Sequence, residues 1–171
     1  MTDEERTAGE DFRTLLDFLN DTPNRLANLI GGLSDDEIRL KNSADEFSAL
    51  ENICHLRDLE LQGYTPRIRR ILAEADPALA DFDGARVAAE SSYNSEQPGV
   101  ALEAFQTARQ DNVELLRALT EVELEREGTL AGIGKITLKR LAELMREHDE
   151  GHLEDLRVLR LRIERCRELT R

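Results

Sequence analysis

The chain lacks the residues that mark several classes of protein. Its 171 residues include no tryptophan and only two cysteines, and aromatic residues make up 4% of the sequence. Two cysteines cannot build the disulfide framework of a small secreted domain. No apolar run approaches the roughly 18–20 residues of a membrane-spanning helix, and residues 1–12 are too acidic for a signal peptide. We therefore expect a soluble, cytoplasmic protein without a membrane partner.

Negative charge dominates the sequence. The 36 acidic residues against 23 basic ones give a formal net charge of −13, which would repel a phosphate backbone. We therefore expect no nucleic-acid partner. One stretch departs from this balance, LRVLRLRIERCRELTR at residues 156–171, which contains six arginines. We interpret it as a solvated helix face with cations near the helix C-terminus, and binding of an anionic partner is the alternative.

Apolar residues recur at helical spacing in four stretches. These cover about residues 11–33, 48–73, 98–123 and 137 almost to the end of the chain. No segment has a convincing strand pattern. These features predict an all-α protein, a four-helix bundle of up-down-up-down-like order with a long crossover between helices two and three. Residues 1–171 are expected to form a single domain of this kind.

Local signals refine this outline. Pro23 predicts a kink or a restart inside the first helix. Ser48 and Glu51 have the spacing of a capping box that begins the second helix, whose apolar stripe should include Leu61. Pro66 is expected to bend that helix. The stretch EREGTLAGIGK before the fourth helix is predicted to be a glycine-rich turn.

Two of the three histidines of the chain, His148 and His152, lie four residues apart in REHDEGHLEDL. They take places in an apolar stripe, so both imidazoles should face the same side of the fourth helix. A buried ring nitrogen without a partner costs about 1–3 kcal/mol. Each histidine could bond a buried carboxylate or carbonyl or lie at a polar end of the bundle, or both could bind a metal ion. A metalloprotease H-E-x-x-H helix is disfavoured because Asp149 stands where that motif has glutamate.

The third histidine, His55, lies on the second helix, which can face the fourth helix across a bundle. All three rings could then meet at one metal ion, and this favours the metal over separate buried partners. Three neutral imidazoles leave an open position, as in catalytic rather than structural zinc sites. The reacting group would be metal-bound water or thiol. Cys54 lies about 100° around the helix from His55, so we expect Cys54, and likewise Cys166, to be a small core residue.

Carboxylates near the histidines are candidates for holding the imidazoles through their second ring nitrogens. Helical spacing brings Glu51 and Asp58 near His55, and it brings Asp149 and Asp155 near the pair on the fourth helix. The alternative for each of the four is a solvated surface carboxylate.

The sequence around these histidines resembles the DinB/YfiT-like superfamily, four-helix bundles with a three-histidine metal site. FSALENICHLRDLE is similar to the family motif around the first histidine, and ITLKRLAELMREHDEGHLEDLRVL to its closing H-x3-H helix. TPNRLANLIGGLSDDEI and PRIRRILAEADPALADFD are also typical of the family. Phe47 stands where the family usually has tryptophan. The resemblance covers nearly the whole chain.

The resemblance implies that His55, His148 and His152 bind a divalent metal ion, commonly zinc or nickel. It also implies thiol-dependent transfer, with a low-molecular-weight thiol such as mycothiol, bacillithiol or glutathione. We therefore expect a metal-dependent S-transferase that acts on a small molecule. A metal-dependent hydrolase and a non-catalytic, stress-related metal-binding bundle are the alternatives. A homodimer is expected by analogy, although no exposed apolar stripe identifies its interface.

Overall fold

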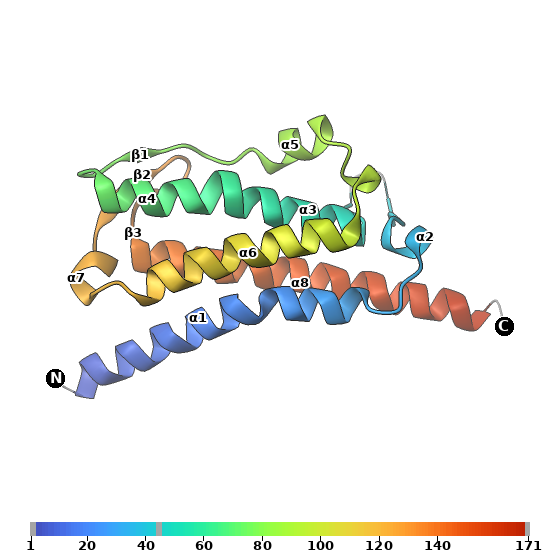
Figure 1. The fold of residues 1–171 in the computed structure, drawn as a ribbon, viewed down its shortest axis with the longest axis horizontal. Coiled ribbons are helices and arrows are strands. Elements are labelled where there is room, and N and C mark those ends of the chain that lie inside the picture. Colours follow the sequence, from blue (N-terminus) through green and yellow to red (C-terminus); the bar gives the residue numbers. More distant parts are fainter. Residues whose placement is uncertain (1–2, 44–45, 170–171) are drawn as a thin grey trace.

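The computed structural model describes residues 3–43 and 46–169, and it confirms the four-helix bundle. The bundle has four long helical segments. The first is α1 (Asp3–Ile30), the third is α6 (Pro98–Arg117) and the fourth is α8 (Leu138–Leu169). The second consists of three consecutive elements, α3 (Ala49–Asp58), η1 (Leu59–Tyr64) and α4 (Thr65–Ala73). Both α1 and α3 pack against α6 and α8, which closes the bundle (Figure 1). Among the described helices, none has the length and hydropathy of a membrane span.

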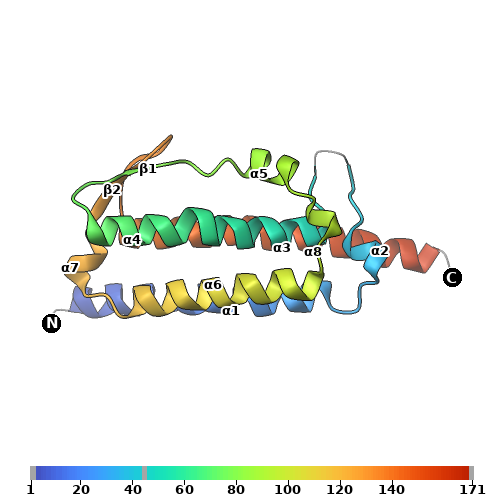
Figure 2. The ribbon, with the colours of Figure 1, turned by 45° about the horizontal axis from the view of Figure 1, so that its top comes forward.

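The long crossover between the second and third long segments sets the direction of the helices. It runs back along the bundle from the end of α4 to the start of α6 (Figures 1 and 2). The second segment and α6 are therefore parallel, and the alternation of directions is broken at this connection. The crossover contains β1 (Ala78–Leu79), α5 (Gly84–Glu90) and the short 3-10 helix η2 (Tyr93–Ser95).

A small sheet lies at one end of the bundle, where we predicted no strand. β1 pairs in parallel with β2 (Glu127–Leu130), which pairs antiparallel with β3 (Gly134–Thr137). The predicted glycine-rich turn is thus a hairpin, whose tip uses the positive φ of Gly132 and Gly134. Strands this short leave almost no periodic signal, and β1 forms only because the crossover brings it beside β2. The one-turn helices α2 (Asp35–Ile38) and α7 (Glu121–Leu124) occupy other connections.

The second helical segment contains a change of helical register. Ser48 and Glu51 form the predicted capping box at its start. Further along, η1 is a π-helix, and Pro66 begins α4 after it instead of bending an α-helix. The wider π-turn rotates the residues that follow. As a result Leu61, predicted on the buried stripe, is 48% exposed, whereas Glu60 is fully buried.

Helix α1 runs through Pro23 without a restart, and its ribbon changes direction along its length (Figure 1). Proline has no N–H, so the carbonyl of Leu19 loses its helical donor. Arg109 on α6 supplies a replacement, because its Nη1 donates to the Leu19 carbonyl oxygen at 3.3 Å. The bend is therefore tied to a buried arginine.

That arginine belongs to a polar layer between the two apolar clusters of the core. The Arg109 guanidinium binds the carboxylates of Glu60 and Asp149, and all three side chains are fully buried. Thr22 donates to Asp149 at 2.8 Å, and Asn112 donates to Glu60 at 2.7 Å. We call these five residues the buried charge network. Its charged members are paired, as burial requires.

The arginine-rich end of α8 has a structural role within the chain. Arg160 donates to the carbonyl oxygens of Leu29 and Gly31 at the end of α1. Arg167 donates to the carbonyl of Gly32 and pairs with Glu37. These arginines donate to carbonyls near the end of α1 that have no donor within the helix. The prediction of a solvated helix face did not include this role. Arg171 lies outside the described residues.

Candidate metal centre

Three imidazole rings from two helices meet in the middle of the bundle. His55 comes from α3, and His148 and His152 come from α8; we call them the histidine triad. The Nε2 atom of His148 lies 3.4 Å from Nε2 of His55 and 3.2 Å from Nε2 of His152. One ring nitrogen of each histidine lies within 4.8 Å of the other two. The structure thus brings the predicted residues together.

The spacing of these nitrogens fits a single metal ion. A tetrahedral ion with ligands at 2.0–2.1 Å holds its nitrogens about 3.3 Å apart, close to both observed separations. Hydrogen bonding alone leaves the triad unsatisfied. The Nε2 atom of His148 carries either one proton or one lone pair, so it cannot serve both neighbours. A shared cation would satisfy all three nitrogens.

The histidines lie at the edge of the buried stripe of α8 rather than on its centre line. Met145, Asp149 and Leu153 are the buried residues at this level, while both histidines are only half-buried. The buried stripe of the structure is therefore displaced by one residue from the predicted stripe, which included both histidines. This displacement turns the imidazoles towards α3 and towards open space, where a ligand can reach them.

Burial keeps the imidazoles neutral. It lowers the pKa of His55 to about 4, and the nearby His148 ring adds to this effect. It lowers the pKa of His152 to about 3, again with a contribution from the other two rings. The pKa of His148 is also lowered by burial. Neutral imidazoles are the form that binds metals.

Asn52 orients one of the rings, and we did not predict this residue. Its side-chain oxygen lies 2.6 Å from Nδ1 of His152, and its amide nitrogen donates to the Ser48 carbonyl at 2.9 Å. The second bond fixes the amide so that its oxygen accepts from Nδ1–H of His152. The Nε2 lone pair of His152 is then free for a metal. The available signal was spacing, since Asn52 precedes His55 by three residues.

The predicted carboxylate partners take other roles. Within the described parts of the chain, none of the four hydrogen-bonds to a histidine. Glu51 accepts from the Ser48 backbone N–H at 2.8 Å, and Asp58 accepts from the Tyr93 hydroxyl at 2.8 Å. Both carboxylates therefore bind hydrogen-bond donors other than the histidines. The charge of Asp58 still acts on His55 in the direction of a higher pKa.

The two carboxylates on α8 differ from each other. Asp149 is fully buried and belongs to the buried charge network, so it reaches His148 only through its charge. Asp155 is exposed and borders a cavity next to His152. The backbone spacing was right for both, but the direction of each side chain depends on the packing around α8.

The triad lies between two cavities. The first, of about 340 Å³, is bordered by His55 and His148 together with mostly apolar residues; we call it the apolar cavity. The second, of about 470 Å³, is bordered by His152 and Asn52 together with several charged side chains, and we call it the polar cavity. The triad is thus accessible from two sides.

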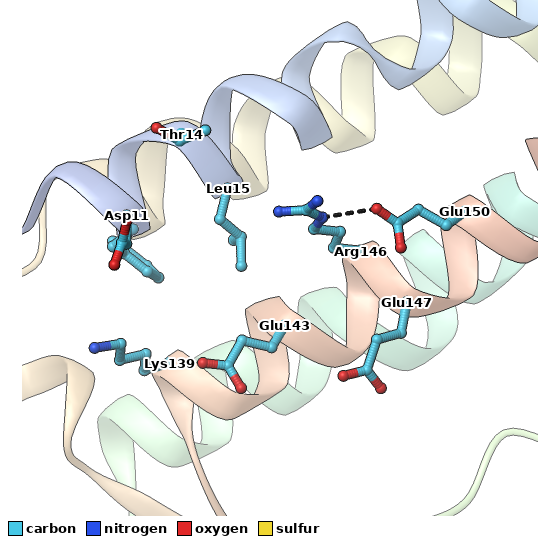
Figure 3. Close-up of a pocket in the computed structure, with 9 residues that line it drawn as sticks. Asp11, Thr14, Leu15, Lys139, Glu143, Arg146, Glu147 and Glu150 are labelled. Carbon is cyan, nitrogen blue, oxygen red and sulfur yellow. Dashed lines mark hydrogen bonds and ion pairs between the residues drawn. The ribbon is translucent and has the colours of Figure 1, made fainter. Parts of the chain in front are cut away.

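A third hollow, of about 420 Å³, lies between α1 and α8 and is not part of this centre. None of the triad borders it. Figure 3 shows its charged side chains along α8, with Arg146 paired to Glu150. This hollow therefore gives no access to the triad.

A glycine makes room for His55. A Cβ atom on Gly84, at the start of α5, would lie 2.5 Å from Cε1 and 3.1 Å from Nδ1 of His55. The rings of Phe47 and Phe82 flank the same imidazole, at 5.3 and 6.0 Å between centroids. The His55 ring is therefore held by close packing, and its Nδ1 has no hydrogen-bond partner among the residues that the structure describes.

We expect Gly84→Ala to weaken metal binding by about 10-fold or more, because the new methyl group must displace the His55 ring. The matched control is Gly151→Ala on α8, between the other two histidines, where a Cβ meets nothing within 4 Å. The control should bind metal normally and gain about 0.5–1 kcal/mol of stability from helix propensity. Calorimetric titration with Zn²⁺ measures the first effect and urea unfolding the second. Equal zinc affinity in both variants would contradict the role of Gly84.

We expect the metal-free protein to lose stability as pH falls below about 6.5. The folded pKa values of the triad lie below the ordinary value of 6.5, so the unfolded chain binds more protons below that pH. The contribution is absent above pH 7 and grows as pH falls towards 4. Urea midpoints at pH 7 and pH 5 measure it. His152→Asn should reduce the difference between the two midpoints, and an unchanged difference would contradict this assignment.

The cysteines divide between core and surface. Cys54 is fully buried, as predicted, and burial raises its pKa to about 12. Cys166 is exposed, contrary to prediction, because it lies in the last turn of α8, beyond Ile163, the last buried residue of that helix. Neither residue belongs to the triad.

The chain is similar to known proteins in sequence and in fold. The sequence model of the DinB superfamily matches residues 19–156. The solved structure of YfiT from Bacillus subtilis superposes with a TM-score of 0.83 at 20% identity, covering 91% of this chain and 89% of that one. YfiT is described as a probable metal-dependent hydrolase with an unusual four-helix bundle topology. A search of curated proteins found no match. Since the family match spans most of the sequence, this chain belongs to the DinB superfamily.

Proposed function

We propose that the histidine triad binds one divalent metal ion, zinc or nickel, and that the protein is a metal-dependent enzyme. Its reaction is the transfer of a low-molecular-weight thiol to a small electrophilic molecule. The observation that carries this proposal is the position of three converging Nε2 atoms between two cavities. An ion bound by three neutral imidazoles lowers the pKa of a coordinated water or thiol towards neutrality.

The residues of the chain prepare this centre. Asn52 keeps a proton on Nδ1 of His152, so Nε2 remains a lone-pair donor. Burial keeps the imidazoles unprotonated at neutral pH. The rings of Phe47 and Phe82, both tilted relative to the imidazole, pack beside His55 and hold it in place.

The thiol in this proposal comes from a co-substrate. Cys54 is buried, and its pKa of about 12 leaves almost no thiolate at neutral pH. Cys166 lies about 21 Å from His152 along the axis of α8. Neither can deliver a sulfur to the triad without a large rearrangement.

Two cavities favour a reaction of two substrates. The polar cavity, with Glu46, Asp155 and Arg162 on its border, suits a charged thiol of the glutathione type. The apolar cavity, bordered by Phe82 and Leu130 among others, suits the electrophile. Both would then meet at the triad, as proximity catalysis requires.

Metal-dependent hydrolysis is the second candidate. It is favoured by the likeness of the fold to YfiT, described as a probable hydrolase. In that reaction water replaces the thiol, and one cavity would suffice.

The test compares both reactions on the same zinc- or nickel-loaded protein. Glutathione, cysteine and bacillithiol are each supplied with 1-chloro-2,4-dinitrobenzene, and p-nitrophenyl acetate without thiol reports hydrolysis. Conjugation that requires metal and disappears in His148→Ala supports the transferase. Ester cleavage with the same requirements and no conjugation supports the hydrolase. Metal binding without either activity, accompanied by a large rise in melting temperature, would contradict an enzymatic role and indicate a structural metal.

We also propose a homodimer, as the family resemblance suggests. Light scattering on the full chain at micromolar concentration should give twice the mass of 19.4 kDa. A monomer mass at all concentrations would contradict it.

A further inference from the structure

The apolar cavity is bordered by an arginine that has no ion-pair partner among the described residues. Arg67, on α4, borders the cavity, and this residue is only 8% exposed. A guanidinium in such a place normally has a carboxylate partner. Arg109, the other buried arginine, has two. Across the described chain, Arg67 forms no ion pair.

The hydrogen bonds of Arg67 use only one side of its guanidinium. Nε and Nη2 both donate to the carbonyl oxygen of Ala80, at 3.3 and 2.9 Å. Nη1 donates to no described residue. This leaves the edge formed by Nη1 and Nη2, which matches the two oxygens of a carboxylate. Burial lowers the pKa of Arg67, while the charge of Asp81 acts in the direction of a higher pKa.

Tyr64 adds a second donor beside the first. It borders the same cavity and is 5% exposed, and its hydroxyl donates to no described residue. The Arg67 guanidinium carbon lies 5.9 Å from the centroid of the Tyr64 ring. Burial raises the pKa of Tyr64, so the hydroxyl keeps its proton and can donate. Two donors on largely buried residues, both without an acceptor among the described residues, therefore border one space.

The helix places Arg67 on the same side as His55. His55, Leu59, Gly63 and Arg67 follow one another at intervals of four residues, and a Cβ on Gly63 would touch Cδ1 of Leu59 at 2.6 Å. The same Cβ would lie 3.6 Å from Nη1 of Arg67. The guanidinium therefore lies back over Gly63, towards His55. Gly63 follows His55 by eight residues, across the end of α3 and the π-helix η1.

We infer that Arg67 and Tyr64 form a carboxylate-binding subsite in the apolar cavity, and that the substrate there is an elongated, mostly apolar carboxylic acid. The acid group lies on Arg67, and the apolar body runs along Leu59 towards His55. This inference rests on the proposed function only in assigning the reacting end of the acid to the triad.

The acidic groups near the cavity do not occupy the subsite. Asp81 is exposed and accepts from the backbone N–H of Phe82. Glu147 is exposed and pairs with Arg140 at 2.7 Å. Charges in contact with water act weakly at a distance, whereas the buried guanidinium is screened less. A carboxylate ligand is therefore attracted to Arg67 more than it is repelled at the mouth.

The test uses 4-phenylbutyrate and its neutral amide, 4-phenylbutyramide, titrated calorimetrically into the metal-free full-length protein. Removing the metal ensures that the carboxylate cannot bind an ion at the triad. We expect the acid to bind at least about tenfold more tightly than the amide. Arg67→Gln should abolish this preference, Arg67→Lys should retain part of it, and Tyr64→Phe should weaken it about threefold.

Arg69→Gln is the matched control, because Arg69 is exposed on the same helix; it should bind the acid like the native protein. Circular dichroism establishes that each variant is folded, and zinc affinity should be unchanged in Arg67→Gln. Equal binding of acid and amide, or a preference that survives in Arg67→Gln, would overturn the inference. So would a preference seen only with zinc present. Failure of the native protein to bind zinc would overturn the proposed function instead, while the preference of the metal-free protein remained.

Discussion

Replacement of His148 by alanine is expected to lower the affinity for Zn²⁺ or Ni²⁺ by more than about 100-fold. His148 is the central member of the triad, since its Nε2 atom lies within 3.4 Å of both other Nε2 atoms. Loss of an outer hydrogen-bond partner alone costs about 10–100-fold in metal affinity, and loss of a ligand should cost more. Metal content by mass spectrometry and calorimetric titration measure the change.

The melting temperature of the metal-free protein separates function from structure. Nδ1 of His148 has no hydrogen-bond partner in the described part of the chain, so the imidazole contributes little to folding without metal. We expect metal-free His148→Ala and His148→Asn to melt within about 3 °C of the native protein. Full retention of metal in either variant would contradict the assignment of the triad, and collapse of the metal-free fold would indicate a structural residue.

Replacement of Arg109 by alanine is expected to destabilise the protein by about 3–5 kcal/mol. The change leaves Glu60 and Asp149 fully buried without their cation, and it removes the donor to the Leu19 carbonyl beside Pro23. The melting temperature should fall by roughly 10 °C or more. Urea unfolding at pH 7 measures the loss of free energy.

The matched control is Arg117→Ala, on the same helix. Arg117 pairs with Asp17 at 2.9 Å, but both side chains are at least half exposed, so the loss should stay below about 1 kcal/mol. A triple variant, Arg109→Met with Glu60→Gln and Asp149→Asn, should recover most of the stability, because no buried charge remains. An Arg109→Ala variant as stable as the control would contradict the importance of the network.

The number and position of the long helices could be predicted because their signals are local. Apolar spacing and the capping box at Ser48 act over a few residues and do not depend on distant parts of the chain. The triad could also be predicted, because only three histidines exist and facing helices can bring them together. Its spacing in the structure agrees with that prediction.

The partners of the triad could not be predicted in the same way. The carboxylates nearest in sequence bind other groups, and Asn52 orients His152 instead. Gly84 lies against His55 because the crossover folds back over α3. Such contacts depend on side-chain direction and on segments distant in sequence, for which spacing gives no information.

By itself, the sequence determined the helical class, the extent of most helices and the identity of the three histidines, since these follow from periodicity and composition. Only the tertiary structure decided the π-turn that buries Glu60, the parallel course of the second segment and α6, and the position of Arg67, which forms no ion pair with a described carboxylate. These features arise where segments far apart in the chain compete for the same buried space, and that competition is settled by packing and hydrogen bonding together.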